Sequence, residues 1–368
     1  MLKNIRKYDE YYSALFGIFN PYSDAFEYKL SRNIPAFDKT AYDMHEKYRF
    51  VYDKLFIAKS QGVRCGTFKE FDGQFPIFIK PRYGHQTSSS KNCYKIYSQE
   101  ELNKYTHLPD MMWSEFINHT EGMTDFVLLN GEIVYQMTYR YSDEQYGFAD
   151  VWKYISADNK PPEKVVRWVN QHMIDYTGPL NIQYRSDIII EVGMRFARSG
   201  IYLESTDNKY IIDNINHLWH NKEWKTVLEQ KIEFKPYYSF KCWSPIPIFY
   251  LIPQHILDLI MTTVGAKRFY EYYFEPTGKT SVVFFQFLHE DFDIGMKTKR
   301  LIEMLMNGIQ ILILLLVLCG IMLLAFNYKV YAMVVFMIIG GIMITGLINS
   351  LNVIYSQIVN QKQFYMFF

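Results

Sequence analysis

A lysine at the end of a short apolar run is the residue whose setting most directly suggests chemistry. Lys80 follows Ile77-Phe78-Ile79, whose length and β-branched content predict a buried strand. Pro81 is expected to end the strand, and the loop Gly84 to Ser90 is rich in small and hydroxyl side chains. Backbone N–H groups of such a loop can surround phosphate oxygens while a lysine supplies the charge. The segment predicts a phosphate site, although taken alone it also fits an ordinary strand with an exposed lysine.

A carboxylate and an amide form the second candidate pair. Gln183 and Glu191 lie in two apolar runs, Leu180 to Tyr184 and Ile188 to Val192, separated by three polar residues. A hairpin would place both side chains on one face, where their oxygens suit Mg²⁺. An unpaired carboxylate in an apolar strand is costly, which favours a functional role for Glu191. Gln183 fits a hydrogen-bonded core amide equally well.

The elements that position these residues alternate between hairpins and isolated helices. Helices are expected over 48–61, 98–104, 161–177, 207–221 and 256–264, and strands over 63–68, 76–80, 113–117, 124–129, 132–139, 180–184, 188–192 and 281–288. Asn130-Gly131 between apolar runs is a strong hairpin signal. The order favours an α+β fold over a doubly wound parallel sheet. The apolar helix 256–264 fits packing on the domain or lying on a membrane surface.

Taken in chain order, these motifs resemble the ATP-grasp superfamily, especially the branch similar to carbamoyl-phosphate synthetase and biotin carboxylase. The resemblance covers about residues 46–220, and it is carried by these segments: Asp53-Lys54, Lys80-Pro81-Arg82, Trp113 to Ile117, Glu121 to Asp125, Asn130-Gly131, Gly178 to Gln183 and Ile190 to Phe196. It implies two α+β lobes that clasp ATP, a small lobe over 46–115 and a large lobe over 116–220. Family members activate a carboxylate as an acyl phosphate, which an amine or another nucleophile then attacks.

The same resemblance implies a role for each matching residue. The residues that would contact ATP are Lys54 and Lys80 at the phosphates, Gly84, Thr87 and Ser88 in the lid, Glu115, Phe116 and Ile117 at adenine, and Glu121 at the ribose. Gln183 and Glu191 would bind Mg²⁺, and Arg195 would join Lys80 at the transferred phosphoryl group. From the residues alone, Lys54 also fits a solvated helix lysine, and Arg195 also fits a structural partner of Glu191.

Three departures from the family pattern leave a second function open. The sequence has Gly193-Met194-Arg195 where the family usually has Asn-Pro-Arg, so a second metal ligand is missing. Gln86 and Ser89 stand where the lid usually has glycine, which should stiffen the loop. The N-terminal extension, residues 1–45, is short for the domain that commonly precedes the ATP-binding lobes. A degenerate ATP-grasp fold that serves as a membrane or virion scaffold is therefore the alternative to a ligase.

Composition sets further bounds. A chain of 368 residues has room for about two domains, and a net charge of +1 gives no reason to expect nucleic-acid binding. The 31 Tyr and 28 Phe residues suggest an AT-rich genome, as in some large DNA viruses or protists. The cysteines, Cys65, Cys93, Cys242 and Cys319, form no C-x-x-C pair and fit a reducing compartment. The N-terminus shows no apolar segment typical of a secretory signal.

Two uncharged apolar segments lie in the C-terminal part of the chain. Met304 to Tyr328 and Val330 to Tyr355 each have the length of a membrane span, and a very short connector predicts a transmembrane hairpin over 304–355. A buried helical hairpin of a soluble domain is the alternative, and the absence of charges gives little support to a transport path. The basic residues Lys297, Lys299 and Arg300 precede the first segment in a juxtamembrane region over 221–303. The positive-inside rule places the catalytic domain, both termini and the tail 356–368 in the cytosol.

Overall fold

The fold was determined as a computed structural model, and it describes residues 30–31, 33–35, 37–86, 92–146, 149–197, 203, 209–244, 251–268 and 282–344. The chain separates into two compact units. Among the described residues, the first unit holds 30–143 and 153–236, and the second holds 144–152 and 237–344. The fold is α+β, as the sequence predicts.

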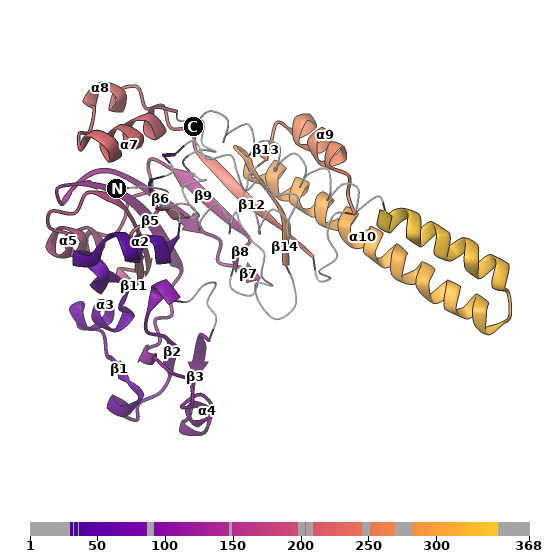
Figure 1. Cartoon of the computed structure of the whole chain (residues 1–368), viewed down its shortest axis with the longest axis horizontal. Coiled ribbons are helices and arrows are strands. Elements are labelled where there is room, and N and C mark those ends of the chain that lie inside the picture. Colours follow the sequence, from indigo (N-terminus) through magenta and orange to yellow (C-terminus); the bar gives the residue numbers. More distant parts are fainter. Residues whose placement is uncertain are drawn as a thin grey trace. The chain divides into compact units, whose positions relative to one another are not determined.

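The first unit contains a small antiparallel sheet of strand order β1-β4-β2-β3. Its strands are β1 (Cys65–Thr67), β2 (Ile77–Pro81), β3 (Tyr94–Ile96) and β4 (Met111–Glu115). Strands β1, β2 and β3 of this sheet are labelled in Figure 1. The alternation of β2 buries Ile77 and Ile79 on one face against Trp113 of β4. Helix α4 (Gln99–Asn103) has Ser98 as its N-cap, whose side chain accepts a hydrogen bond from Glu101 N. Lys80 therefore lies on the face of β2 opposite this core.

Five neighbouring strands of a second antiparallel sheet belong to this unit, in the order β11-β10-β5-β6-β9. These strands are β5 (Glu121–Leu129), β6 (Glu132–Tyr141), β9 (Trp152–Ser156), β10 (Gly178–Arg185) and β11 (Ile188–Gly193). Asn130 and Gly131 both have positive φ and form the predicted β5–β6 turn. The helical elements of this unit are α2 (Asp38–Met44), η1 (Glu46–Tyr52), α3 (Lys54–Ser60), α5 (Glu163–His172), α7 (Lys209–Asn221) and α8 (Thr226–Glu229), with short 3₁₀ turns η2 (Phe68–Glu70) and η3 (Gly84–Gln86). Phe126 and Ile182 of the sheet pack with Val51 and Trp168 in one core.

Two predicted helices differ from those observed. The single helix expected over 48–61 is the 3₁₀ turn η1 followed by α3, because Asp53 interrupts it with extended backbone and caps α3 by accepting a hydrogen bond from Leu55 N. The helix expected over 161–177 ends at His172. Its continuation is a turn in which Asp175 has a φ of 61° and the buried Tyr176 donates to Pro179 O.

The second unit contains strands that the sequence only partly predicts. Its elements are β7 (Gln145–Tyr146), β8 (Ala149–Asp150), β12 (Tyr237–Ser244), α9 (Gln254–Val264), β13 (Lys267–Arg268), β14 (Val282–His289) and α10 (Phe292–Ala325). Phe240 and Cys242 of β12 pack against Phe285 and Phe287 of β14 and against Met306 of α10. Strand β12 falls in a stretch rich in Pro and aromatic residues, where the sequence predicts no strand.

Helix α10 is the one helix of the described residues that is long and apolar enough to cross a membrane. It has 34 residues, and a shorter apolar helix, Lys329–Ile344, follows it. Gly320 of α10 lies against Phe336 of that helix, so the two helices contact each other. The sequence predicts a second span to Tyr355, but residues 345–355 lie outside those described.

Candidate functional site

Three residues of the first unit, Lys54, Lys80 and Gly84, lie close to Glu191 or to its neighbour Ile190. Lys54 Nζ, at the start of α3, lies 3.2 Å from Glu191 Oε1. Lys80 Nζ, from β2, donates to the carbonyl oxygen of the neighbouring Ile190 at 2.9 Å. A Cβ at Gly84, the first residue of η3, would lie 3.4 Å from the same Glu191 oxygen and 3.5 Å from Lys54 Cε. The two predicted lysines, the start of the predicted lid and the predicted metal ligand are thus brought together.

The two lysine-bearing segments are fixed to each other by Asp53 and Arg82. Asp53 precedes Lys54, and its carboxylate accepts bidentate hydrogen bonds from Arg82 at 2.8 and 2.5 Å. Lys54 N also donates to Arg82 O at 2.9 Å. A bidentate Arg–carboxylate pair fixes orientation as well as distance. The start of α3 is therefore held beside the end of β2, which positions Lys54 close to Lys80.

The charges in this cluster shift one another's protonation. Burial, followed by repulsion from Lys54, lowers the pKa of Lys80 to about 8, although Glu191 opposes that shift. Burial alone would raise the pKa of Glu191, but Lys54, Lys80 and Arg195 outweigh it and leave the pKa below its usual value. Glu191 is therefore ionised at neutral pH, and Lys80 changes charge just above neutral pH.

Gln183 lies directly across the β10–β11 ladder from Glu191, as the predicted hairpin requires. Residues that face each other across a ladder have side chains on the same side of the sheet. The ladder shifts its register immediately after this pair, between Gln183 and Tyr184. Such a bulge commonly re-aims side chains next to a site.

Arg195 is held by residues that the sequence interpretation did not single out. Its guanidinium donates to Asp38 Oδ2 at 2.8 Å and to Asn181 Oδ1 at 3.0 Å. Asn181 in turn donates to the buried Asp125 at 2.8 Å. Arg195 is thus paired with Asp38, not with Glu191 as the alternative interpretation had it. No short-range pattern reveals Asp38, since it lies 157 residues before Arg195.

The buried Asp125 fixes the residues that hold Arg195 in place. Its carboxylate accepts hydrogen bonds from Tyr139 at 2.6 Å, from Asn181 at 2.8 Å and from the backbone N–H of Ala197 at 2.8 Å. Burial raises the pKa of Asp125, and these hydrogen bonds oppose the shift. Its carboxylate therefore organises the loop that carries Arg195.

Asp125→Ala is expected to destabilise the protein by about 3 kcal/mol or more, because it leaves several buried donors without acceptors. For a unit of this size that loss lowers the melting temperature by roughly 6–12 °C. Thermal unfolding of the purified chain in detergent measures the change, with the exposed Asp213→Ala as the control. A melting temperature equal to that of wild type would contradict this role of Asp125.

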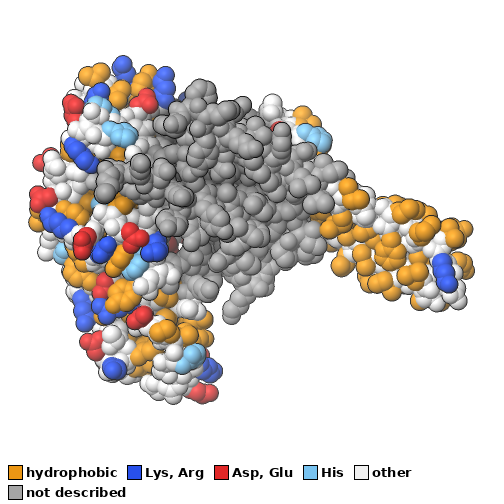
Figure 2. Space-filling model, viewed as in Figure 1, with side chains coloured by type: hydrophobic (Ala, Val, Ile, Leu, Met, Phe, Trp, Pro, Cys, Tyr) orange, Lys and Arg blue, Asp and Glu red, His pale blue; other side chains and the backbone are white. Residues whose placement is uncertain are grey.

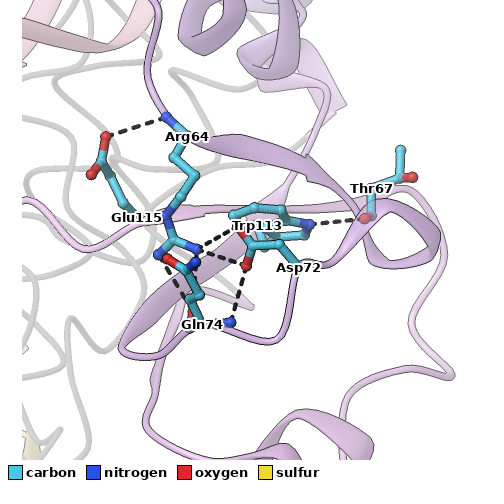
Figure 3. Close-up of polar contacts among 6 residues, drawn as sticks. All are labelled: Arg64, Thr67, Asp72, Gln74, Trp113 and Glu115. Atoms are coloured by element: carbon cyan, nitrogen blue, oxygen red, sulfur yellow. Dashed lines mark hydrogen bonds and ion pairs between the residues drawn. The ribbon is translucent and has the colours of Figure 1, made fainter.

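The segment predicted to contact adenine joins the two sheets of the first unit. It leaves β4 at Glu115 and continues through Phe116 and Ile117 before β5 begins. The Glu115 carboxylate accepts a hydrogen bond from the backbone N–H of Arg64, while the Arg64 guanidinium binds Asp72 and Gln74 O (Figure 3). The Glu115 side chain is thus used for structure, and its backbone N–H also donates to Arg64 O at 2.8 Å.

Two further predicted site residues have clear positions, and two others lie outside the described residues. Phe116 lies under Lys95 Nζ, which is 3.7 Å from the ring centroid. Glu121, predicted at the ribose, is paired with Arg185 at 3.3 Å across the β5–β10 ladder. Thr87 and Ser88, predicted in the lid, lie outside the described residues.

The cluster carries more cationic than anionic side chains. Three cationic side chains, Lys54, Lys80 and Arg195, face two carboxylates, Glu191 and Asp38. Among the described residues, no group of three or more His, Cys, Asp or Glu side chains could hold a metal ion. In proteins Mg²⁺ is usually held by one or two carboxylates together with waters and the phosphate oxygens of a substrate.

Comparison with known proteins finds likeness in structure alone. No protein family matches the sequence, and no curated protein matches it significantly. The L-amino acid ligase from Bacillus licheniformis aligns with a TM-score of 0.48 and 14% identity, covering 73% of each chain. The carboxyaminoimidazole ribonucleotide synthase from Aspergillus clavatus, complexed with ATP, aligns with a TM-score of 0.48 and 11% identity, covering 72% of this chain and 78% of that one.

A third aligned structure is the N5-carboxyaminoimidazole synthetase from Staphylococcus aureus, complexed with ADP. It has a TM-score of 0.47 and 14% identity, and the alignment covers 72% of this chain and 76% of that chain. All three scores lie below 0.5, so the interpretation of the site rests on the geometry of this chain's own residues.

Proposed function

We propose that the protein binds ATP with Mg²⁺ in the first unit and acts as a carboxylate ligase of the ATP-grasp type. The observation that carries the proposal is the convergence of Lys54, Lys80 and Gly84 on Glu191. Phosphate binding requires cations brought together from separate segments, and this cluster provides one lysine from α3 and one from β2. The motif order between residues 46 and 220 supports the same assignment.

In this proposal, catalysis depends on position and charge. Lys54 and Lys80 bind phosphate oxygens, and Arg195 stabilises the charge that develops on the transferred phosphoryl group. A carboxylate oxygen of the substrate attacks the terminal phosphorus, and ADP leaves. An amine or another nucleophile then attacks the acyl phosphate carbon, and phosphate leaves. No protein nucleophile is required, because both steps need only alignment and neutralisation of charge.

The residues present fit a magnesium ion. Glu191 is ionised, and Gln183 lies opposite it on the same face of the sheet. One or two protein oxygens beside a polyphosphate are a common setting for Mg²⁺. When bound, the ion would neutralise phosphate charge, while Glu191 and Gln183 would fix its place.

The test uses the full chain in detergent with two measurements. Calorimetry of ADP with Mg²⁺ detects the nucleotide site. Incubation with ATP, a panel of carboxylates and hydroxylamine then detects acyl phosphate, because hydroxylamine captures it as a hydroxamate. Failure to bind ADP would overturn the nucleotide site.

A scaffold with a degenerate ATP-grasp fold is the second candidate. Gly193 gives the site no side chain beside Glu191, and Lys54 is already paired with Glu191. Binding of ADP with no carboxylate-dependent turnover across the panel would favour the scaffold over the ligase.

The nucleotide site should respond to pH through Lys80. Its pKa of about 8 means that the free protein loses this charge as the pH rises through 8. A bound phosphate favours the charged form, so binding at pH 8.5–9 should take up a proton, and affinity should fall as pH rises above 8. Calorimetry in two buffers of different ionisation enthalpy measures the uptake. Persistence of the same uptake in Lys80→Met would contradict the assignment.

We further propose that α10 and the helix after it anchor the protein in a membrane. Large apolar side chains of the second half of α10 are exposed, namely Ile311, Leu312, Leu314, Leu315, Leu318, Ile321, Met322 and Leu324. Figure 2 shows hydrophobic side chains over this hairpin. An exposed apolar surface of this extent marks a membrane or partner contact.

The part of α10 that precedes Ile311 has a different environment. Gln310 exchanges hydrogen bonds with Ser244 of β12, and Lys299 pairs with Glu303. The expected span from Met304 therefore begins within a part of the helix that packs on the sheet of the second unit. Lys297 and Arg300 remain exposed and still support a cytosolic position for the soluble part.

Leu314→Lys with Leu318→Lys should release the protein from membranes. Each lysine costs about 2.5–3.5 kcal/mol near the bilayer centre, and both leucines are more than half exposed, at 57% and 53%. Flotation of alkaline-washed membranes on a density gradient measures the effect, and Leu314→Ala with Leu318→Ala is the matched control. Flotation of the lysine variant equal to wild type would argue against insertion.

A further inference from the structure

The carboxylate of Asp38 occupies the space in which a side chain at residue 193 would lie. A Cβ built on Gly193 would lie 2.4 Å from Asp38 Oδ1, which is closer than real Cβ contacts come. The same Cβ would lie 3.5 Å from Arg195 Cζ. Gly193 is two residues after Glu191 in β11, so both positions point to the same face of the strand. Asp38 thus brings an oxygen to the face of β11 that carries Glu191.

The two oxygens of Asp38 have different environments. Oδ2 accepts the hydrogen bond from Arg195. Oδ1 is buried and has no hydrogen-bond partner. A buried carboxylate oxygen without a partner is costly, and each such atom in a native protein calls for an explanation such as an ion.

Helix α2, which carries Asp38, is fixed against the site. Ala41 is fully buried in the core of the first unit. Tyr42 stacks on His85 of η3 with ring centroids 3.6 Å apart, and its carbonyl accepts a hydrogen bond from Arg49 at 2.9 Å. The position of Asp38 is therefore set by packing on both sides of the helix.

We infer that Asp38 supplies a ligand oxygen, through Oδ1, to a divalent cation bound with the nucleotide. The inference rests on the proposed function, since the cation needs phosphate oxygens to complete its shell. Asp38 replaces, from another segment of the chain, the ligand that Gly193 cannot provide. Asp38 fills the space that a side chain at residue 193 would need.

Variants that move the ligand oxygen from residue 38 to residue 193 test this inference. In Asp38→Ala the ligand oxygen is lost and the space beside Gly193 opens. Adding Gly193→Asn then returns an amide oxygen to that space from the strand itself, and adding Gly193→Ala fills the space without an oxygen. All variants are measured as full chains in detergent.

The readout is the ratio of ADP affinities with Mg²⁺ and with a chelator. Asp38→Ala should lower this ratio by about tenfold or more, with little change in metal-free ADP binding. The Asn double variant should recover most of the ratio, and the Ala double variant should not. A Mn²⁺ titration of the ADP complex should show the same order.

Three results overturn the inference. If Asp38 only orients Arg195, Asp38→Ala weakens ADP binding equally with and without Mg²⁺. If Mg²⁺ enhances binding to Asp38→Ala as it does to wild type, Asp38 is no ligand, while the nucleotide site stands. If wild type binds no ADP under either condition, the proposed function fails together with the inference.

Discussion

Lys80→Met is expected to weaken ADP binding by roughly 10- to 150-fold at pH 7, the loss that corresponds to about 1.5–3 kcal/mol for one charge-assisted hydrogen bond. At this pH Lys80 carries its charge, since its pKa is about 8. Its Nζ uses one donor on Ile190 O, and its other hydrogens remain for phosphate oxygens. Methionine has a similar length and no charge, so the fold should tolerate it.

Calorimetry with ADP and Mg²⁺ measures this loss, and the exposed Lys104→Met is the matched control. The melting temperature of Lys80→Met should equal or exceed that of wild type, because a partly buried charge has been replaced by an apolar group. Affinity equal to wild type in a folded Lys80→Met would remove Lys80 from the site.

The local parts of the site could be predicted because short patterns determine them. The β10–β11 hairpin follows from two apolar runs around a short turn, and it sets Gln183 opposite Glu191. The strand that carries Lys80 follows from its β-branched run and from Pro81, its last residue. Each of these features depends on residues within about ten positions of one another, where periodicity and turn chemistry decide the outcome.

The parts that depend on distant segments could not be predicted. Asp38 belongs to a stretch of weak periodicity, and its importance appears only when α2 packs beside Gly193 and Arg195. Asp125 looked like one more polar residue in a strand, yet it holds Asn181 and the loop after β11. Strand β12 was missed because its partner, β14, follows in the chain only after a long intervening segment. Burial of polar groups is a tertiary property, and a local pattern carries little of it.

Glu191→Gln is expected to change the affinity for ADP in opposite directions without and with Mg²⁺. The carboxylate lies 3.2 Å from Lys54 and is ionised, so without a cation it repels phosphate and competes for the lysine. Removing its charge should therefore strengthen metal-free ADP binding by a few-fold. With Mg²⁺ the variant should bind about tenfold more weakly than wild type or worse, since a charged ligand of the ion is gone.

Because the two changes in ADP affinity have opposite signs, they distinguish a metal ligand from a carboxylate with a structural role only. A structural role would change binding in the same direction with and without Mg²⁺, because the loss of Lys54's partner does not depend on the ion. Calorimetry in Mg²⁺ and in chelator gives both affinities, and Glu100→Gln, an exposed change on α4, is the control. Full retention of the magnesium enhancement in Glu191→Gln would show that Glu191 serves only to hold Lys54. The lysine cluster would then bind nucleotide without a protein-held ion, as a scaffold could, and not with the charge neutralisation that phosphoryl transfer requires.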